Sequence, residues 1–215
     1  MPSPLLSLGA LLLALPAVAQ DAPPSPKAES GLKITERFIN TAGEAVQSVA
    51  EVKLQIQSTL GSYNSLVNEI SKDRRGDYKK LTKAVEGTRK RVEEVRERLG
   101  ILDLEAKTYF DSWAKSQEAI GNPDLKKKGM ERLADSRKRY DGILAGLKSA
   151  RQEFDPFMGD LGDQITFLGH DLNSSAAASL KPEALKLNGR GEKVFSRVDE
   201  AMRAANDYIR SLRPE

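Results

Sequence analysis

Residues 81–106 read LTKAVEGTRKRVEEVRERLGILDLEA. Apolar or small side chains recur along this stretch in alternating steps of four and three, at Leu81, Val85, Thr88, Val92, Val95, Leu99, Leu102 and Ala106. Residues three and four apart lie on one face of an α-helix, so this spacing is the seam of a coiled coil or helical bundle. The period of two that marks a β-strand is absent. The stretch therefore predicts one long helix with a single apolar face.

The same spacing continues outward from this stretch over nearly the whole chain. The seam of this segment covers residues 78–120, and three further seams cover residues 38–70, 130–172 and 180–212. We predict an all-α protein, an elongated antiparallel bundle or coiled coil of four long helices that forms a single domain over residues 31–215. Pro156 lies inside the third seam, and because proline removes one backbone hydrogen bond we expect a kink there.

Turn residues separate the four segments. Gly76 lies between the first two, and Ser179 precedes the Lys181-Pro182-Glu183 start of the last. The sequence Gly121-Asn122-Pro123-Asp124 predicts the end of one helix and the start of the next, with Asn122 as N-cap and Pro123 in the first turn. Such short connections place consecutive helices antiparallel.

Residues 1–19, MPSPLLSLGALLLALPAVA, form an uncharged leader. Its apolar run from Leu5 to Val18 is about 21 Å long as a helix, which is shorter than the roughly 30 Å core of a bilayer. The run ends in Ala17-Val18-Ala19, a pattern that signal peptidase cleaves. We expect a signal peptide cleaved after Ala19, a Pro-rich linker over residues 20–30 and a periplasmic or secreted protein. The leader lacks Lys and Arg, and an uncleaved anchor is the alternative.

Charge alternates in blocks that a helical hairpin would bring together. Residues 71–100 carry a net charge of +5, 101–125 of −3, 126–140 of +5 and 141–180 of −4. A hairpin about residue 122 pairs residues whose numbers add to roughly 244. It therefore places basic residues 71–100 opposite acidic residues 144–173, and acidic residues 101–118 opposite basic residues 126–140. Flanking charges of this kind set the register of paired helices.

Two arginines occupy seam positions that normally hold apolar side chains. In the predicted hairpin, Arg151 lies opposite Glu93 and Glu94, and Arg137 lies near Glu105. We expect these ion pairs to fix the register of the hairpin, at some expense in stability.

Two clusters of basic residues offer a surface for an anionic polymer or membrane. They consist of Lys126, Lys127, Lys128, Arg89, Lys90 and Arg91. The alternative is that both clusters belong to solvated helix faces complemented by the hairpin partner. We do not expect nucleic acid as a ligand, because no aromatic residues are interleaved with the basic ones for base stacking.

The composition contains few of the residue types that commonly act in catalysis. The chain of 215 residues contains no Cys and one His, which excludes thiolate chemistry, Cys-based zinc sites and iron–sulfur clusters. His170 is followed by Asp171 and Ser174, but adjacent helical residues diverge by about 100° and cannot form a local triad. Phe167 stands where a di-iron bundle needs a Glu. We expect no catalytic residues, no cofactor and no metal.

Several stretches resemble a known family. They are Leu104-Glu105-Ala106 with Trp113, residues 132–140 (RLADSRKRY), and the run from Phe154-Asp155-Pro156 through residues 164–173 (QITFLGHDLN) to residues 178–180 (ASL). Over about residues 32–212 the chain resembles the bacterial family catalogued as domain of unknown function 2959. The resemblance implies an exported helical protein of the cell envelope without a known activity. Relatives often look like lipoproteins with a Cys after the leader, and because this sequence has none we expect no lipid anchor.

These features favour a non-enzymatic structural or protein-interaction module of the bacterial cell envelope. Its expected partner is an envelope protein or a second copy of this chain. The alternative is a binder of an anionic envelope polymer or membrane surface through the basic helix faces. An enzyme, the third hypothesis, would need a substrate-sized cavity near His170.

Overall fold

The computed structural model describes residues 30–68 and 72–213, and within these residues it contains helices and no strand. The helices are α1 (Gly31–Val67), α2 (Arg74–Glu118), α3 (Pro123–His170), α4 (Ser174–Ser179) and α5 (Lys181–Leu212). The predicted all-α bundle of four long helices is therefore confirmed. The predicted signal peptide, its cleavage site and all of the linker except Ser30 lie outside the described residues.

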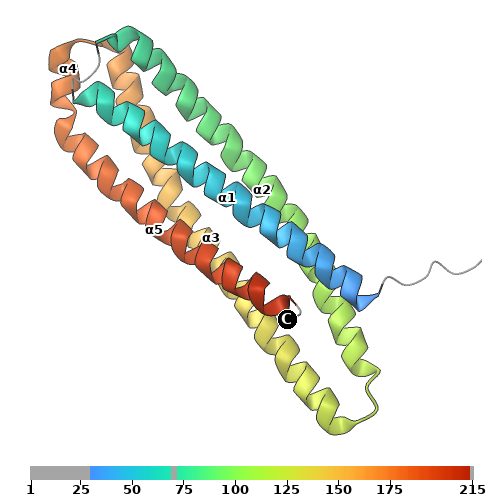
Figure 1. Cartoon of the computed structure of the whole chain (residues 1–215). Helices are drawn as coiled ribbons and strands as arrows, with labels where there is room; N and C mark the ends of the chain where they lie inside the picture. Colours follow the sequence, from blue (N-terminus) through green and yellow to red (C-terminus); the bar gives the residue numbers. More distant parts are fainter. Residues whose placement is uncertain (1–29, 69–71, 214–215) are drawn as a thin grey trace, which may run out of the picture.

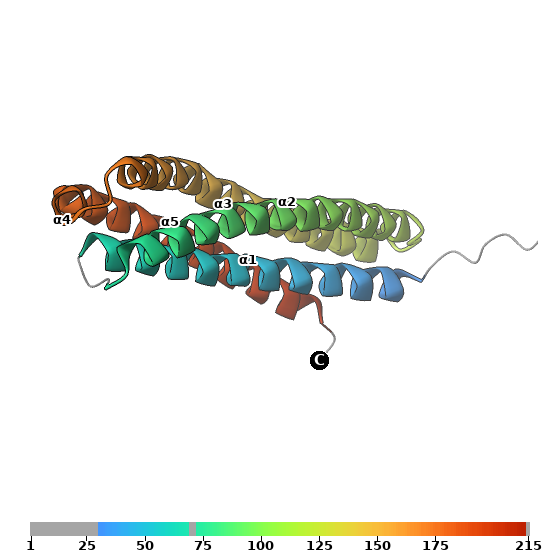
Figure 2. The same cartoon turned by 90° about the horizontal axis from the view of Figure 1, so that it is seen from above.

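The four long helices form a narrow antiparallel bundle (Figures 1 and 2). Helix α1 packs against α2 and α5, and α3 packs closely against α5 and more loosely against α2. Short α4 lies at one end of the bundle, and at the other end the α2–α3 hairpin reaches beyond the ends of α1 and α5 (Figure 1). The connection at residues 119–122 makes α2 and α3 sequential neighbours, yet they are the loosest of the four adjacent pairs.

Local polar residues define where the helices begin. The Asn122 side chain accepts from the backbone N–H groups of Asp124 and Leu125 at 3.0 and 3.1 Å, which confirms the predicted cap. Ser179 is not the cap of the last helix. It ends the unforeseen helix α4 and donates to the carbonyl oxygen of Ala176, while α5 starts without a side-chain cap.

The apolar seams form the core, which divides into two clusters along the bundle. In α5 every seam residue from Leu180 to Tyr208 is buried, including Gly191. One cluster lies toward α4 and includes Tyr63, Leu81, Leu161 and Leu187. The other lies toward the α2–α3 turn and is rich in aromatic rings, among them Phe38, Tyr109, Phe110, Tyr140 and Tyr208.

Helix α3 continues through Pro156 without a break. Phe154, Phe157 and Met158 are buried on either side of the proline and tie this part of the helix to the core. Continuity of the helix agrees with the seam, and the kink at Pro156 stays a prediction.

The register of the α2–α3 hairpin is close to the predicted one. The Tyr78 hydroxyl donates to the carbonyl oxygen of Ile165 at 3.2 Å, a pair whose numbers add to 243. The charges, however, do not pair mainly across this hairpin. Arg91 and Arg98 of α2 pair instead with Glu51 and Glu44 of α1, at 3.6 and 3.4 Å.

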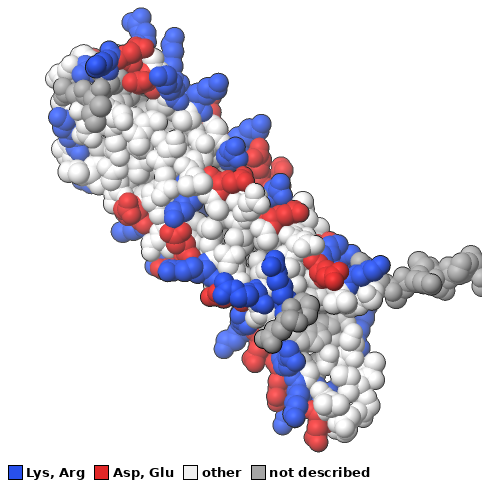
Figure 3. Space-filling view, in the orientation of Figure 1, with Lys and Arg blue, Asp and Glu red and all other residues white. Residues whose placement is uncertain are grey.

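Charged side chains of both signs are mixed along most of the visible face, and an uncharged area lies toward the α4 end (Figure 3). Part of the reason is that residues 54–68 of α1 and its C-cap contain no charged side chain. No helix in residues 30–68 and 72–213 has the length and apolar character needed to cross a bilayer.

Candidate binding groove

The middle of the bundle is not closed between α2 and α3. Six apolar residues that the seams predict as core remain only half-buried: Val52, Val92, Val95, Leu99, Leu144 and Leu147. All six line one cavity of about 460 Å³, to which all four long helices contribute. The groove lies where the two core clusters meet, since its walls pack partly against each of them.

The orientation of α3 explains the opening. Its most buried residues between 136 and 157 are Ser136, Tyr140, Ile143, Ala150, Phe154 and Phe157. This stripe runs beside the predicted seam, because α3 makes its closest packing with α5. Leu144, Leu147 and Arg151 are thereby left at the side that faces α2. The sequence carried one sign of this arrangement, namely the charged Arg151 on the seam.

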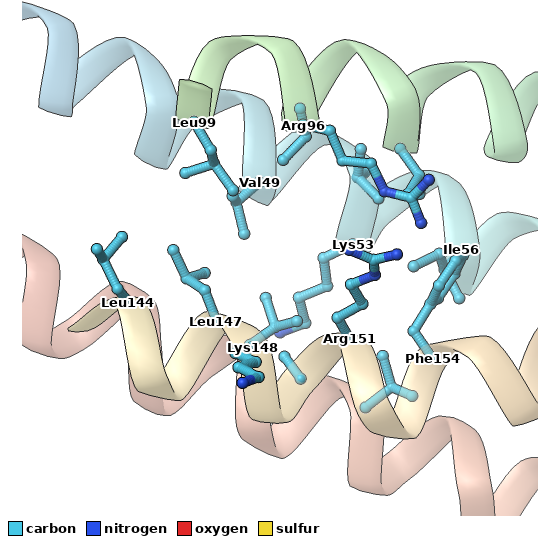
Figure 4. Close-up of a pocket in the computed structure, with 16 residues that line it drawn as sticks. Val49, Lys53, Ile56, Arg96, Leu99, Leu144, Leu147, Lys148, Arg151 and Phe154 are labelled. Atoms are coloured by element: carbon cyan, nitrogen blue, oxygen red, sulfur yellow. The ribbon is translucent and has the colours of Figure 1, made fainter. Parts of the chain in front are cut away.

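The groove combines an apolar floor with a cationic rim (Figure 4). The floor is formed by Val, Leu, Ile, Ala and Phe side chains, and the polar lining residues are all cations: Lys53, Arg96, Lys148 and Arg151. No carboxylate lines this cavity. Arg96 from α2 and Arg151 from α3 extend toward each other across the groove (Figure 4).

Carboxylates outside the groove compensate part of this charge. The Lys53 ammonium bonds both carboxylate oxygens of Asp199 at 2.7 Å, so this pair is neutral. Arg96 and Arg151 share Asp155, at 3.9 and 3.5 Å. Arg96 also pairs with Glu93. Lys148 forms no ion pair with a described residue.

One donor at the groove has no acceptor. The Nε–H of Arg96 is buried and has no hydrogen-bond partner among the described residues. An unsatisfied buried donor of this kind costs about 1–3 kcal/mol. The folded bundle therefore holds Arg96 in place at a cost that its ion pairs with Glu93 and Asp155 must offset.

Arg137 and Arg151, which were expected to fix the register of the hairpin, do not pair with the predicted glutamates. Glu105 accepts from Arg37 of α1 at 2.7 Å, and the Arg137 guanidinium lies 5.0 Å from the centre of the Phe110 ring. Arg151 pairs with Asp155 of its own helix. Among the described residues, the pair Arg137–Glu105 is therefore absent. So are pairs of Arg151 with Glu93 and Glu94, because α2 directs these charges to α1 or along its own surface.

The two predicted basic clusters lie far apart. Lys126, Lys127 and Lys128 occupy the fourth to sixth positions of α3, where Lys127 and Lys128 are exposed. Arg89, Lys90 and Arg91 lie in the middle of α2, roughly 28 residues or about 42 Å from the start of the hairpin turn. The bundle does not merge them into one surface.

His170 is the exposed last residue of α3. The neighbouring polar residues have structural contacts, since Asn173 caps α4 by accepting from the Ala176 N–H at 2.8 Å and bonds Asp171 at 2.5 Å. Across residues 30–68 and 72–213, no group of three His, Asp or Glu side chains is placed to hold a metal ion.

Fold and groove together define an all-helical bundle with an apolar cleft in its side. A family model described as protein of unknown function (DUF2959) matches residues 27–212, and the chain belongs to this family. No curated protein and no solved structure matches the chain.

Proposed function

We propose that this protein is a non-enzymatic interaction module of the bacterial cell envelope and that the groove between α2 and α3 is its binding surface. The observation that carries the proposal is the set of six half-buried seam residues around a cavity of about 460 Å³. Small-molecule sites typically measure about 300–1,000 Å³ and are mostly apolar with a few polar groups, as this groove is.

The opening between α2 and α3 is bounded by closed core along the seam of α2. On either side of the groove, the seam residues of α2 are buried, as at Val85 and Leu102. Burying apolar surface stabilises a protein by roughly 25 cal/mol for each Å² removed from water, and the half-buried side chains of the groove lack part of this stabilisation. A ligand seated in the groove would recover this free energy.

Site-specific crosslinking in cells tests the proposal. A photoreactive benzoylphenylalanine replaces Lys148 at the rim of the groove in a tagged chain, and its adducts are identified by mass spectrometry after irradiation. Lys138 is the matched control, because it is an exposed lysine of the same helix that does not line the groove. We expect a reproducible adduct at position 148 that is absent at position 138. Identical adducts at both positions, or none at 148, would refute the proposal.

Binding of an anionic polymer or membrane surface is the second candidate. It is favoured by the exposure of Lys127 and Lys128, which form no ion pair with a described residue. Binding that falls steeply with salt and is lost when Lys126, Lys127 and Lys128 are changed to Gln would support this function. Retained binding in that triple variant would exclude it.

A further inference from the structure

We propose that the groove binds a single-chain anionic amphiphile, with its hydrocarbon chain on the apolar floor and its acidic head between Arg96 and Arg151. This inference rests on the proposed function, since it names the class of ligand for the same groove. A fatty acid is the simplest molecule of this class.

The floor fits a hydrocarbon chain. The lining residues of α3 extend from Leu144 to Phe154, ten residues or about 15 Å along the helix axis. The apolar lining residues over that length are Leu144, Leu147, Ala150 and Phe154 of α3, and Val95 and Leu99 of α2 and Val198 of α5 line the same cavity. An apolar lining of this length accommodates an extended acyl chain along the bundle axis.

The rim fits an acidic head group. Arg96, Arg151 and Lys148 contribute three positive charges, whereas their ion-pair partners Glu93 and Asp155 contribute two negative charges. One carboxylate from a ligand would balance this set. Guanidinium–carboxylate hydrogen bonds are short and strong compared with neutral ones.

Three amphiphiles with the same hydrocarbon chain and different head groups test whether the ligand is an anionic amphiphile. Laurate, dodecanol and dodecyltrimethylammonium are titrated into the purified protein below their critical micelle concentrations, and binding is followed by calorimetry. We expect laurate to bind about tenfold more tightly than dodecanol, and dodecyltrimethylammonium to bind most weakly. The double variant Arg96→Gln/Arg151→Gln should reduce laurate affinity to that of dodecanol.

Two further variants test whether laurate affinity depends on the charges at the groove or on the net charge of the protein. Asp155→Asn releases both guanidinium groups from their shared partner, so it should tighten laurate binding. Lys107→Gln/Lys115→Gln removes two positive charges from exposed lysines of α2 that do not line the groove, as many as the double arginine variant removes, and should leave laurate affinity unchanged. Circular dichroism of every variant verifies that its helix content equals that of the parent protein.

The outcomes distinguish this inference from the proposed function. Equal binding of laurate and dodecanol, both abolished by Val95→Phe, would overturn the anionic head group while the groove remains a binding site. If no amphiphile binds and a protein adduct forms at position 148, the groove does not bind an amphiphile and its ligand is that protein. No amphiphile binding and no adduct would overturn both.

Discussion

Tyr140 and Tyr208 belong to the same aromatic cluster and differ in one hydrogen bond. Both side chains are buried, but the Tyr208 hydroxyl bonds Ser136 at 2.8 Å, whereas the Tyr140 hydroxyl is buried without a partner among the described residues. Removing a hydroxyl that has no partner removes a desolvation penalty, and removing one that is bonded removes a favourable contact.

We therefore expect Tyr140→Phe to be at least as stable as the parent protein. Tyr208→Phe should lower the free energy of unfolding by about 1 kcal/mol. Urea unfolding followed by circular dichroism measures both changes, and a larger loss for Tyr140→Phe than for Tyr208→Phe would contradict the assignment.

Burial also makes Tyr208 sensitive to alkaline pH. Desolvation raises the pKa of Tyr208 to about 12, whereas an unfolded tyrosine has a pKa of about 10. The contribution of Tyr208 to stability is therefore complete below about pH 10 and is lost as the pH rises toward 12, at up to about 1.4 kcal/mol per pH unit. Above pH 10, Tyr208→Phe should lose stability less steeply than the parent protein. Parallel slopes in urea unfolding between pH 9 and 12 would contradict this.

At the scale of the helices, Gly191 lets α5 approach α1 closely. A Cβ atom at Gly191 would lie 2.9 Å from Cδ2 of Leu60, a buried side chain. At Gly189, one half-turn earlier and exposed, a Cβ atom would meet nothing within 4 Å. The two glycines of one helix thus separate helix propensity from packing.

We expect Gly189→Ala to raise the melting temperature, because alanine favours a helix over glycine by about 1 kcal/mol. Gly191→Ala should lower the melting temperature, because Leu60 must move within a packed core. Calorimetry of the two variants measures the difference, and equal stabilisation by both would show that α1 and α5 are not in close contact at Gly191.

Much at this scale could be predicted from the sequence. The seams predicted the four long helices, and Asn122 with Pro123 predicted the turn between α2 and α3. Helix α4 was not foreseen because its six residues are too few for a heptad pattern. The partners of Arg137 and Arg151 were not foreseen either. A seam shows which face of a helix is apolar, but it does not show which of two neighbouring helices takes each flanking charge.

At the scale of the whole molecule, the groove is the feature that sequence analysis missed. The seam pattern makes no distinction between Val85, which is buried, and Val95, which borders an open cavity. Their difference arises from the way α3 turns toward α5, and that is a property of the assembled bundle. The same two residues offer a matched test of the cavity.

We expect Val95→Phe to change the free energy of unfolding by less than about 1 kcal/mol, since the larger ring enters empty space. Val85→Phe should destabilise the protein by about 1–3 kcal/mol, because added volume in a packed core forces strain. Urea unfolding compares the two variants of helix α2. An equal loss in both would show that the groove is closed in solution.

The most direct test of a ligand site in the groove is a methyl NMR titration of the intact protein with laurate. We predict that shift changes and contacts with the ligand concentrate on the methyl groups of Val92, Val95, Leu99, Leu144 and Leu147, and that Leu66 and Leu81 in the closed core keep their shifts. Changes centred instead on the exposed side chains Leu54 and Leu185, or no change at saturating laurate, would contradict a binding site between α2 and α3.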